Sequence, residues 1–171
     1  MKKWLPLIII VVIVIGIFRW GVGLNNTMVE KQETAKTQWA NVESAYQRRS
    51  DLIPNLVSTV KGYADFERET LEAVIQARAN ATKTTIDPTN ITPEQMAAFQ
   101  ESQNSLSGAL SRLMVVVEKY PDLKANQNFL ELQSQLEGTE NRINVERNRF
   151  NELAKDYNVY IRRPKKATDL T

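Results

Sequence analysis

The sequence predicts an all-α protein: an antiparallel four-helix bundle of long helices preceded by one N-terminal transmembrane helix. Apolar residues recur at spacings of three and four along most of the chain, which is the repeat of an amphipathic helix. No glycine or proline interrupts the chain between Tyr63 and Asp87. A long apolar run stands near the start. We therefore divide the chain into an N-terminal transmembrane anchor (1–24), a helical bundle (25–163) and a polar C-terminal tail (164–171).

The N-terminal segment has two competing interpretations. Two lysines precede an apolar run over 4–18, Arg19 interrupts it, and apolar character then resumes as far as Leu24. A spanning helix needs about 20 apolar residues, which this segment reaches if Arg19 extends its side chain to the headgroups. A cleaved secretory signal fits the apolar length, but only a weak cleavage site is visible at 21–23. We expect a retained, single-pass anchor, with the initial lysines favouring a bundle outside the cytoplasm.

The first two helices of the bundle are predicted on either side of residue 50. Apolar residues line one stripe from Met28 to Tyr46, and the stripe stops at the polar cluster 48–51. A second helix would begin near Leu52, where Ser50 or Asp51 could cap it and Pro54 would fall in its first turn. A single helix that continues past Pro54 with a kink is the alternative.

The third and fourth helices have the clearer signals. Thr92, Pro93 and Gln95 make an N-cap, a first-turn proline and a capping-box partner after the polar connection 84–92. The third stripe then runs to Tyr120, and Pro121 ends it. The fourth stripe begins at Phe129 and predicts a helix that ends near Pro164. Because the connections are short, sequential helices should lie side by side and antiparallel.

Composition limits the chemistry that the chain could perform. It contains no cysteine and no histidine, so thiolate nucleophiles, imidazole bases and the commonest ligands of transition metals are absent. The net charge of +2 gives no basic surface built for polyanions, and we expect no nucleic-acid partner. We expect no cofactor, no metal site and no catalytic residues.

Two short segments are candidates for interaction or for structure. The first holds Arg48, Arg49, Asp51, Pro54 and Asn55. The arginines could bind lipid headgroups or an acidic partner, but cations also stabilise the C-terminal end of a helix. Capping by Asp51 and a first-turn proline would explain the rest without a partner.

The second segment holds Glu140, Asn141 and Arg142 within the fourth helix. These side chains could be imagined as the acid, amide and base groups of an active site. A charge network within one helix explains them better. Thr139 and Glu146 are polar residues on the otherwise apolar seam, as expected of a register-fixing layer or of a solvated end of the bundle.

Several blocks of the chain resemble the LemA family in the same order. The first is RRSDLIPNLV at 48–57, followed by VKGYA at 60–64 and ERETL at 67–71. Later blocks are LSGALSRL at 106–113, EKYPDLKAN at 118–126 and TENRI at 139–143. The chain departs from the family pattern at Phe66, at Glu146 and from Pro164 onward, where many members carry an apolar, aromatic tail.

The resemblance implies a helical bundle on a membrane anchor, without an established enzymatic activity. It suggests a non-enzymatic scaffold or adaptor of the bacterial envelope, held in the inner membrane with its soluble domain on the extracytoplasmic side. Expected partners are membrane lipid, further copies of the chain as a homo-oligomer, and another envelope protein such as a membrane metalloprotease. The alternative is a metal-dependent hydrolase that uses carboxylates only.

Overall fold

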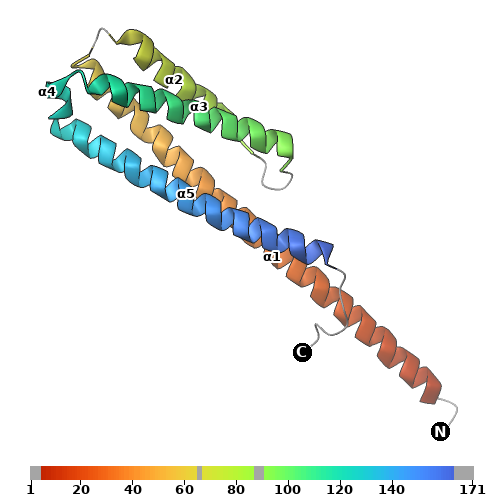
Figure 1. Cartoon of the computed structure of the whole chain (residues 1–171). Helices are drawn as coiled ribbons and strands as arrows, with labels where there is room; N and C mark the ends of the chain where they lie inside the picture. The colour runs from red at the N-terminus through yellow and green to blue at the C-terminus, as the bar shows by residue number, and fades with distance from the viewer. Residues whose placement is uncertain (1–4, 65–66, 87–90, 164–171) are drawn as a thin grey trace. The chain divides into compact units, whose positions relative to one another are not determined.

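The structure, a computed structural model, describes residues 5–64, 67–86 and 91–163, which form α-helices joined by short connections. Its elements are α1 (Leu5–Lys61), α2 (Arg68–Lys83), α3 (Pro93–Val117), α4 (Pro121–Lys124) and α5 (Gln127–Arg162) (Figure 1). The all-α prediction is confirmed. The start of the predicted anchor, Phe66 and the predicted polar tail 164–171 lie outside the described residues.

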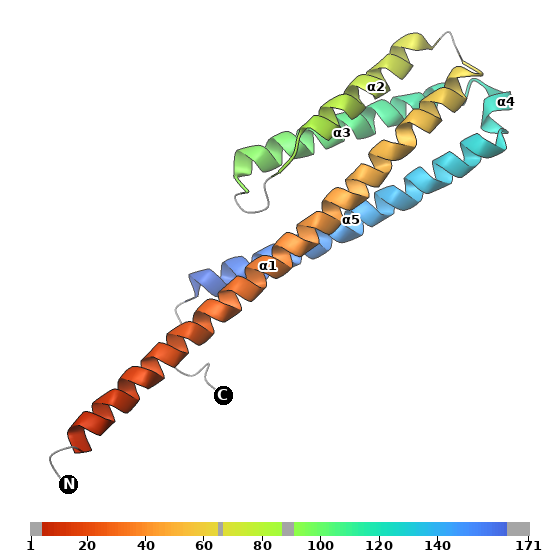
Figure 2. The ribbon, with the colours of Figure 1, turned by 180° about the vertical axis from the view of Figure 1, so that it is seen from behind.

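The helices belong to two compact units, and α1 and α5 run through both. One unit combines Met1–Gln38 with Arg149–Thr171, and the other is Trp39–Asn148. The larger unit holds α2, α3 and α4 together with the C-terminal part of α1 and the N-terminal part of α5. Within it, successive long helices alternate in direction, as both views show (Figures 1 and 2).

The core of the larger unit is built from the apolar stripes of all its helices. It contains, among others, Ile53, Leu56, Val60, Leu71, Val74, Leu106, Leu113, Leu123 and Phe129, all nearly or fully buried. At one end, the Phe99 ring meets the rings of Trp39 and Tyr46 edge-on, with centroids 5.5 Å and 5.1 Å apart. Edge-to-face pairing is favourable because the positive edge of one ring faces the negative face of the other.

The predicted break between the first two helices is wrong. No helix begins near Leu52 and no cap forms at Ser50 or Asp51, because α1 continues through Pro54 to Lys61. The alternative of one helix running past the proline is the correct one. Proline in a helix interior removes one hydrogen bond and usually costs several kcal/mol, so its neighbours must compensate.

The break lies instead between Lys61 and Arg68. The amides of Tyr63 and Ala64 both donate to the carbonyl of Val60, at 3.0 and 2.9 Å, and these bonds close the end of α1. Ala64 is fully buried. An uninterrupted helix would carry Leu71 and Val74 away from Ile53 and Leu56. Only a reversal of the chain lets the apolar stripes of α1 and α2 pack on each other. The chain reverses here although no proline or further glycine follows Gly62 before α2.

The predicted start of the third helix is confirmed. The Thr92 hydroxyl accepts from the Gln95 amide at 3.2 Å, and the Gln95 side chain accepts from the Thr92 amide at 3.1 Å. This reciprocal capping box satisfies two amides that the first turn leaves without helical partners. After α3, the short α4 turns the chain, and the Asn126 side chain accepts from the Phe129 amide at 3.0 Å near the start of α5. The end of α5 at Arg162 agrees with the prediction.

In the smaller unit, the N-terminal part of α1 lies antiparallel to the C-terminal end of α5. The Tyr160 hydroxyl donates to the Leu24 carbonyl at 3.1 Å, and the Lys31 ammonium lies 5.9 Å from the centre of the Tyr160 ring. Before this contact, the apolar side chains at 9–18 are all exposed. An 18-residue window of this helix has a mean hydropathy of 1.8, so the helix is long and apolar enough to cross a membrane.

Candidate functional site

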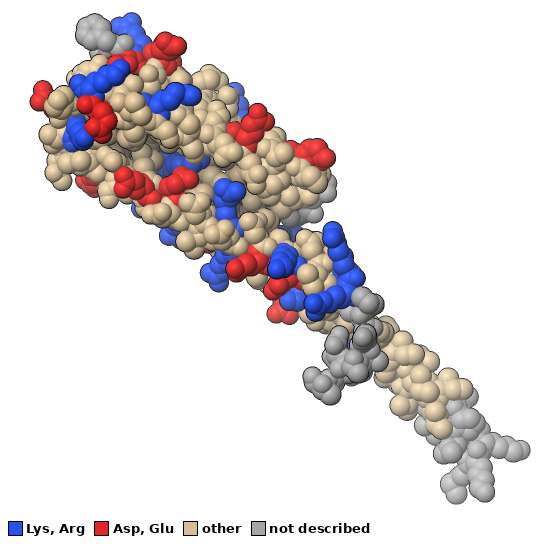
Figure 3. Space-filling model, in the orientation of Figure 1, with Lys and Arg blue, Asp and Glu red and all other residues tan. Residues whose placement is uncertain are grey.

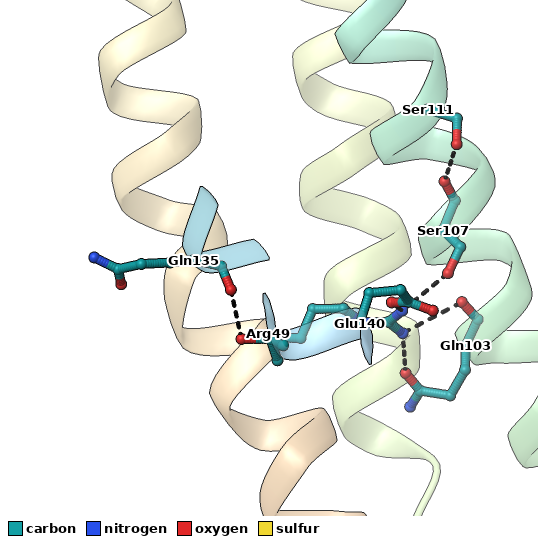
Figure 4. A network of polar contacts seen from close by, with 7 residues as sticks. Arg49, Gln103, Ser107, Ser111, Gln135 and Glu140 are labelled. Carbon is teal, nitrogen blue, oxygen red and sulfur yellow. Dashed lines mark hydrogen bonds and ion pairs between the residues drawn. The ribbon is translucent and has the colours of Figure 1, made fainter. Parts of the chain in front are cut away.

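Arg49 is the centre of a polar network inside the larger unit. It lies on α1 and is only 2% exposed. One terminal nitrogen donates to the Ser107 hydroxyl at 2.9 Å and to the Glu140 carboxylate at 2.8 Å. The other donates to the Gln103 side-chain oxygen at 2.7 Å. Figure 4 shows the guanidinium between α3 and α5 with these partners around it. One side chain therefore connects three helices.

Gln103 extends the network to a fourth helix. Its side-chain nitrogen donates to the carbonyl of Ala81, near the C-terminal end of α2, at 3.2 Å. The side-chain amide of Gln103, on α3, thus accepts a hydrogen bond from α1 and donates one to α2. Thr139, which is buried next to Glu140, donates to the Gln135 carbonyl of its own helix at 2.7 Å. The network fixes the relative register of helices that are far apart in sequence.

The charge pair in the network is asymmetric. The Arg49 side chain is 3% exposed, whereas the Glu140 side chain is 47% exposed, so water solvates the carboxylate but not the cation. The guanidinium also lies 5.2 Å from the centre of the Tyr46 ring, within the range of a cation–π contact. Its Nε has no hydrogen-bond partner among the described residues. A buried guanidinium that loses its hydrogen-bond partners costs free energy, because water cannot replace them. This arrangement therefore favours the one packing of the bundle that keeps them.

Tyr46 responds electrostatically to the same surroundings. Burial raises the pKa of its hydroxyl above the ordinary value of 10.0 because the phenolate would lose its hydration. The cations of Arg147 and Arg49 oppose this rise, and Glu140 adds to it. Tyr46 is therefore protonated at neutral pH.

Pro54 creates a second polar contact between helices. A helical residue at position 54 would donate its amide to the carbonyl of Ser50, but proline has no amide hydrogen. In the structure, Arg78 on α2 donates its Nε to that carbonyl at 2.8 Å. The side chain of one helix thus satisfies an acceptor that the proline leaves open in another. This contact explains how α1 accommodates the proline.

The structure brings together only two of the predicted site residues, Arg49 and Glu140. Arg48, Asp51 and Asn55 are exposed on α1, where Asp51 accepts from the Gln47 side chain at 2.8 Å instead of capping a helix. Asn141 and Arg142 are exposed on α5, and Arg142 lies 3.7 Å from Glu146 one turn later. Arg142 thus pairs within its own helix, whereas Glu140 pairs with Arg49 of α1, so the predicted charge network within one helix does not account for Glu140.

Sequence reasoning missed Gln103, Ser107, Tyr46 and Arg78 as members of these contacts. Gln103 carried a usable signal, since it is a polar residue at a core position of the most regular apolar stripe. No local pattern could have identified Ser107 and Arg78, because their partners, Arg49 and Ser50, are distant in sequence. Among the described residues, no three acidic side chains gather where they could hold a metal ion.

These features define a class: a helical bundle with a buried arginine connector, continuous with an apolar helix that could span a membrane. The family model described as the LemA family matches residues 38–168, and the chain belongs to the LemA family. The resemblance inferred from the sequence blocks is thereby confirmed.

Similar proteins include Protein LemA of Metamycoplasma hominis, 27% identical over 90% of this chain and 67% of that protein. Magnetosome protein MamQ of Magnetospirillum gryphiswaldense is 27% identical over 80% of this chain. Magnetosome protein MamQ 2 of Paramagnetospirillum magneticum is 26% identical over the same share. This chain spans 56% of the length of either MamQ protein. None of these names is that of an enzyme.

Proposed function

We propose that the protein is a non-enzymatic, membrane-anchored scaffold or adaptor of the bacterial envelope. It acts by presenting its bundle to further copies of itself or to another envelope protein. The observation that carries the proposal is the contrast between the two ends of α1. Its apolar side chains at 9–18 are exposed, whereas its C-terminal part is built into a packed core. Exposed apolar surface of this extent needs a lipid or protein environment.

The polar network supports a structural role for the bundle. The Arg49 guanidinium is enclosed by its hydrogen-bond partners Gln103, Ser107 and Glu140. Together with the bond from Gln103 to Ala81, its contacts hold four helices in register, as a rigid binding surface requires. The names of similar proteins are consistent with a role other than catalysis.

Crosslinking in native membranes tests the proposal. A photocrosslinking residue would be placed at exposed positions on the bundle, such as Asn141 and Asn55, and captured neighbours identified by mass spectrometry. We expect position-dependent adducts with copies of the chain or with a specific envelope protein. The same photocrosslinker within 9–18 should capture mainly lipid. Only random adducts at every bundle position would contradict a scaffold.

Metal analysis separates the scaffold from the alternative of a carboxylate-based, metal-dependent hydrolase. The protein purified without chelators should contain no stoichiometric divalent cation. A bound cation at one per chain, accompanied by hydrolysis of an ester, amide or phosphate substrate, would favour the enzyme instead.

Topology can be tested cleanly because the chain has no cysteine. A single cysteine at Ser134, exposed on α5, should react with a membrane-impermeant maleimide in cells whose outer layers are permeable to it. A cysteine inserted directly after Met1 should react only after the membrane is disrupted. The reverse pattern would place the bundle in the cytoplasm.

Self-association is measured by light scattering on the full-length protein in detergent and on a form that lacks 1–24, at matched protein concentrations. We expect the full-length chain to form oligomers, because confinement by an anchor raises the effective concentration of the bundles. If both forms are monomers, binding to a different envelope protein remains as the proposed role.

A further inference from the structure

The C-terminal end of α5 carries a group of cations beside the apolar part of α1. The Tyr160 hydroxyl donates to the Leu24 carbonyl at 3.1 Å, which fixes this end of α5 next to the point where the apolar character of α1 ends. The two segments belong to the same compact unit and run antiparallel. Residues after Tyr160 therefore lie toward the apolar segment of α1.

Helix geometry places these cations at headgroup depth if the apolar segment spans the bilayer. Arg163 is three residues beyond Tyr160, so at about 1.5 Å per residue its backbone lies about 4–5 Å past Leu24. The polar headgroup layer on each side of a bilayer is about 5–8 Å thick. Arg19 stands on α1 in the same region, and half-buried Trp20 and Tyr160 are the amphipathic aromatics that favour this interface.

The cations have the chemistry to bind a phosphodiester. Lys155, Arg162 and Arg163 are exposed, and none takes part in the ion pairs found among the described residues. With Asn151 and Asn158 they line an open groove of about 670 Å³, whose remaining lining is the apolar Ala154 and Val159. Positions 151, 155, 158 and 162 share one face of the helix. Arginine forks and amide nitrogens can donate to phosphate oxygens, and Ala154 and Val159 can contact the glycerol or upper acyl carbons.

The charge on this end of α5 is one-sided. The last acidic residue of the helix is Asp156, and only arginines among charged residues follow it up to Arg163. Figure 3 shows the uncharged surface of the N-terminal helix and, next to it, Lys and Arg side chains with fewer acidic ones beside them. A cationic patch that borders an apolar span attracts anionic lipid.

We propose that Lys155, Arg162 and Arg163 form a binding site for the headgroup of an anionic phospholipid. The site would hold the C-terminal end of α5 at the bilayer surface. This inference rests on the proposed membrane anchoring, because only a spanning apolar segment brings the groove to headgroup depth.

The test uses the full-length protein reconstituted into bilayers of phosphatidylcholine that contain spin-labelled lipids. The relative affinity of the protein for labelled phosphatidylglycerol over labelled phosphatidylcholine is read from the immobilised component of the spectrum. Because each cation near the surface favours anionic lipid by roughly fivefold, we expect a preference of at least that size. The triple variant Lys155→Gln, Arg162→Gln, Arg163→Gln should lose most of it.

Two matched controls make the test specific. The variant Lys83→Gln, Arg112→Gln, Lys119→Gln removes the same charge from exposed positions of the larger unit and should keep the preference. The variant Arg162→Lys, Arg163→Lys retains the charge and should keep most of it. An equal loss in the triple variant and in the charge-matched control would overturn the site, because the effect would then follow net charge.

The remaining outcomes separate the possible failures. Inorganic phosphate, added at constant ionic strength, should not displace the lipid; displacement would assign the groove to free phosphate and overturn the lipid proposal. A protein that inserts into the bilayer but shows no preference refutes the lipid site and leaves the anchor intact. A protein that alkaline carbonate extracts from the bilayer refutes the anchor and, with it, this inference.

Discussion

Arg78 donates its Nε to the carbonyl of Ser50 at 2.8 Å, and Pro54 is the reason that this carbonyl is available. The proline removes the helical donor four residues later in α1, and a side chain from α2 replaces it. The contact is also a link between two helices that the core packs together. It turns a local defect of one helix into a specific tertiary interaction.

We expect Arg78→Ala to destabilise the protein by about 1–2 kcal/mol, because it leaves a buried backbone acceptor without a partner. In a Pro54→Ala background, the amide at position 54 can donate to Ser50, so the same substitution should cost less. Urea unfolding is monitored by circular dichroism for the parent protein, the two single variants and the double variant. The four free energies of unfolding give the coupling energy between positions 54 and 78. Equal costs of Arg78→Ala in both backgrounds would show that the proline and the arginine are independent.

Arg49→Ala should be among the most destabilising single substitutions, at about 3–5 kcal/mol. It removes the donor to the side-chain oxygens of Gln103 and Ser107 and opens a cavity in the bundle. Arg49→Met should cost less, since its apolar stem fills part of the space. The neighbouring Arg48→Ala provides the control, because Arg48 is exposed and should change stability by less than about 0.5 kcal/mol. Similar losses for Arg48→Ala and Arg49→Ala would contradict the role of the network.

Glu140→Gln should have a smaller effect, of about 1–2 kcal/mol, because water already solvates half of the carboxylate. Arg142→Gln, which removes a charge from an exposed position nearby, should be close to neutral. In a double-mutant cycle with Arg49→Met, the loss at Glu140 should shrink. Strictly additive effects would indicate that the Arg49–Glu140 bond contributes nothing measurable.

Thr92→Ala should destabilise the start of α3 and lower the stability by about 1 kcal/mol, since the Gln95 amide loses its acceptor, the Thr92 hydroxyl. Gln100→Ala, at an exposed interior position of the same helix, serves as the control and should be neutral. Hydrogen exchange at the amides of residues 94–96 provides a local measurement. Unchanged protection of these amides in Thr92→Ala would refute the cap.

The raised pKa of Tyr46 predicts that the folded protein loses stability at alkaline pH. Because its pKa is raised in the folded state, its contribution is complete below pH 10 and is lost as the pH rises through the folded value. Tyr46→Phe should therefore lose less stability between about pH 10 and 12 than the parent protein. Absorbance titration should also show that the variant lacks one of the late-ionising tyrosines. Identical pH profiles would remove Tyr46 as their cause.

The sequence by itself determined the helical class, the apolar N-terminal segment and the capping box at Thr92 and Gln95. Each of these depends on residues a few positions apart, so spacing and local hydrogen bonding suffice to predict it. The regular apolar stripe of the third helix likewise predicted a helix as far as Tyr120, close to its observed end at Val117.

The tertiary structure alone decided where α1 ends and what Arg49 does. From local signals, the polar cluster at 48–51 and Pro54 favour a break, but contacts with α2, α3 and α5 keep the helix intact. Arg48 and Arg49 are adjacent and chemically identical in the sequence, yet one is exposed and the other buried. Their difference is set by the side of α1 that faces Glu140, 91 residues away, and no local pattern encodes that distance.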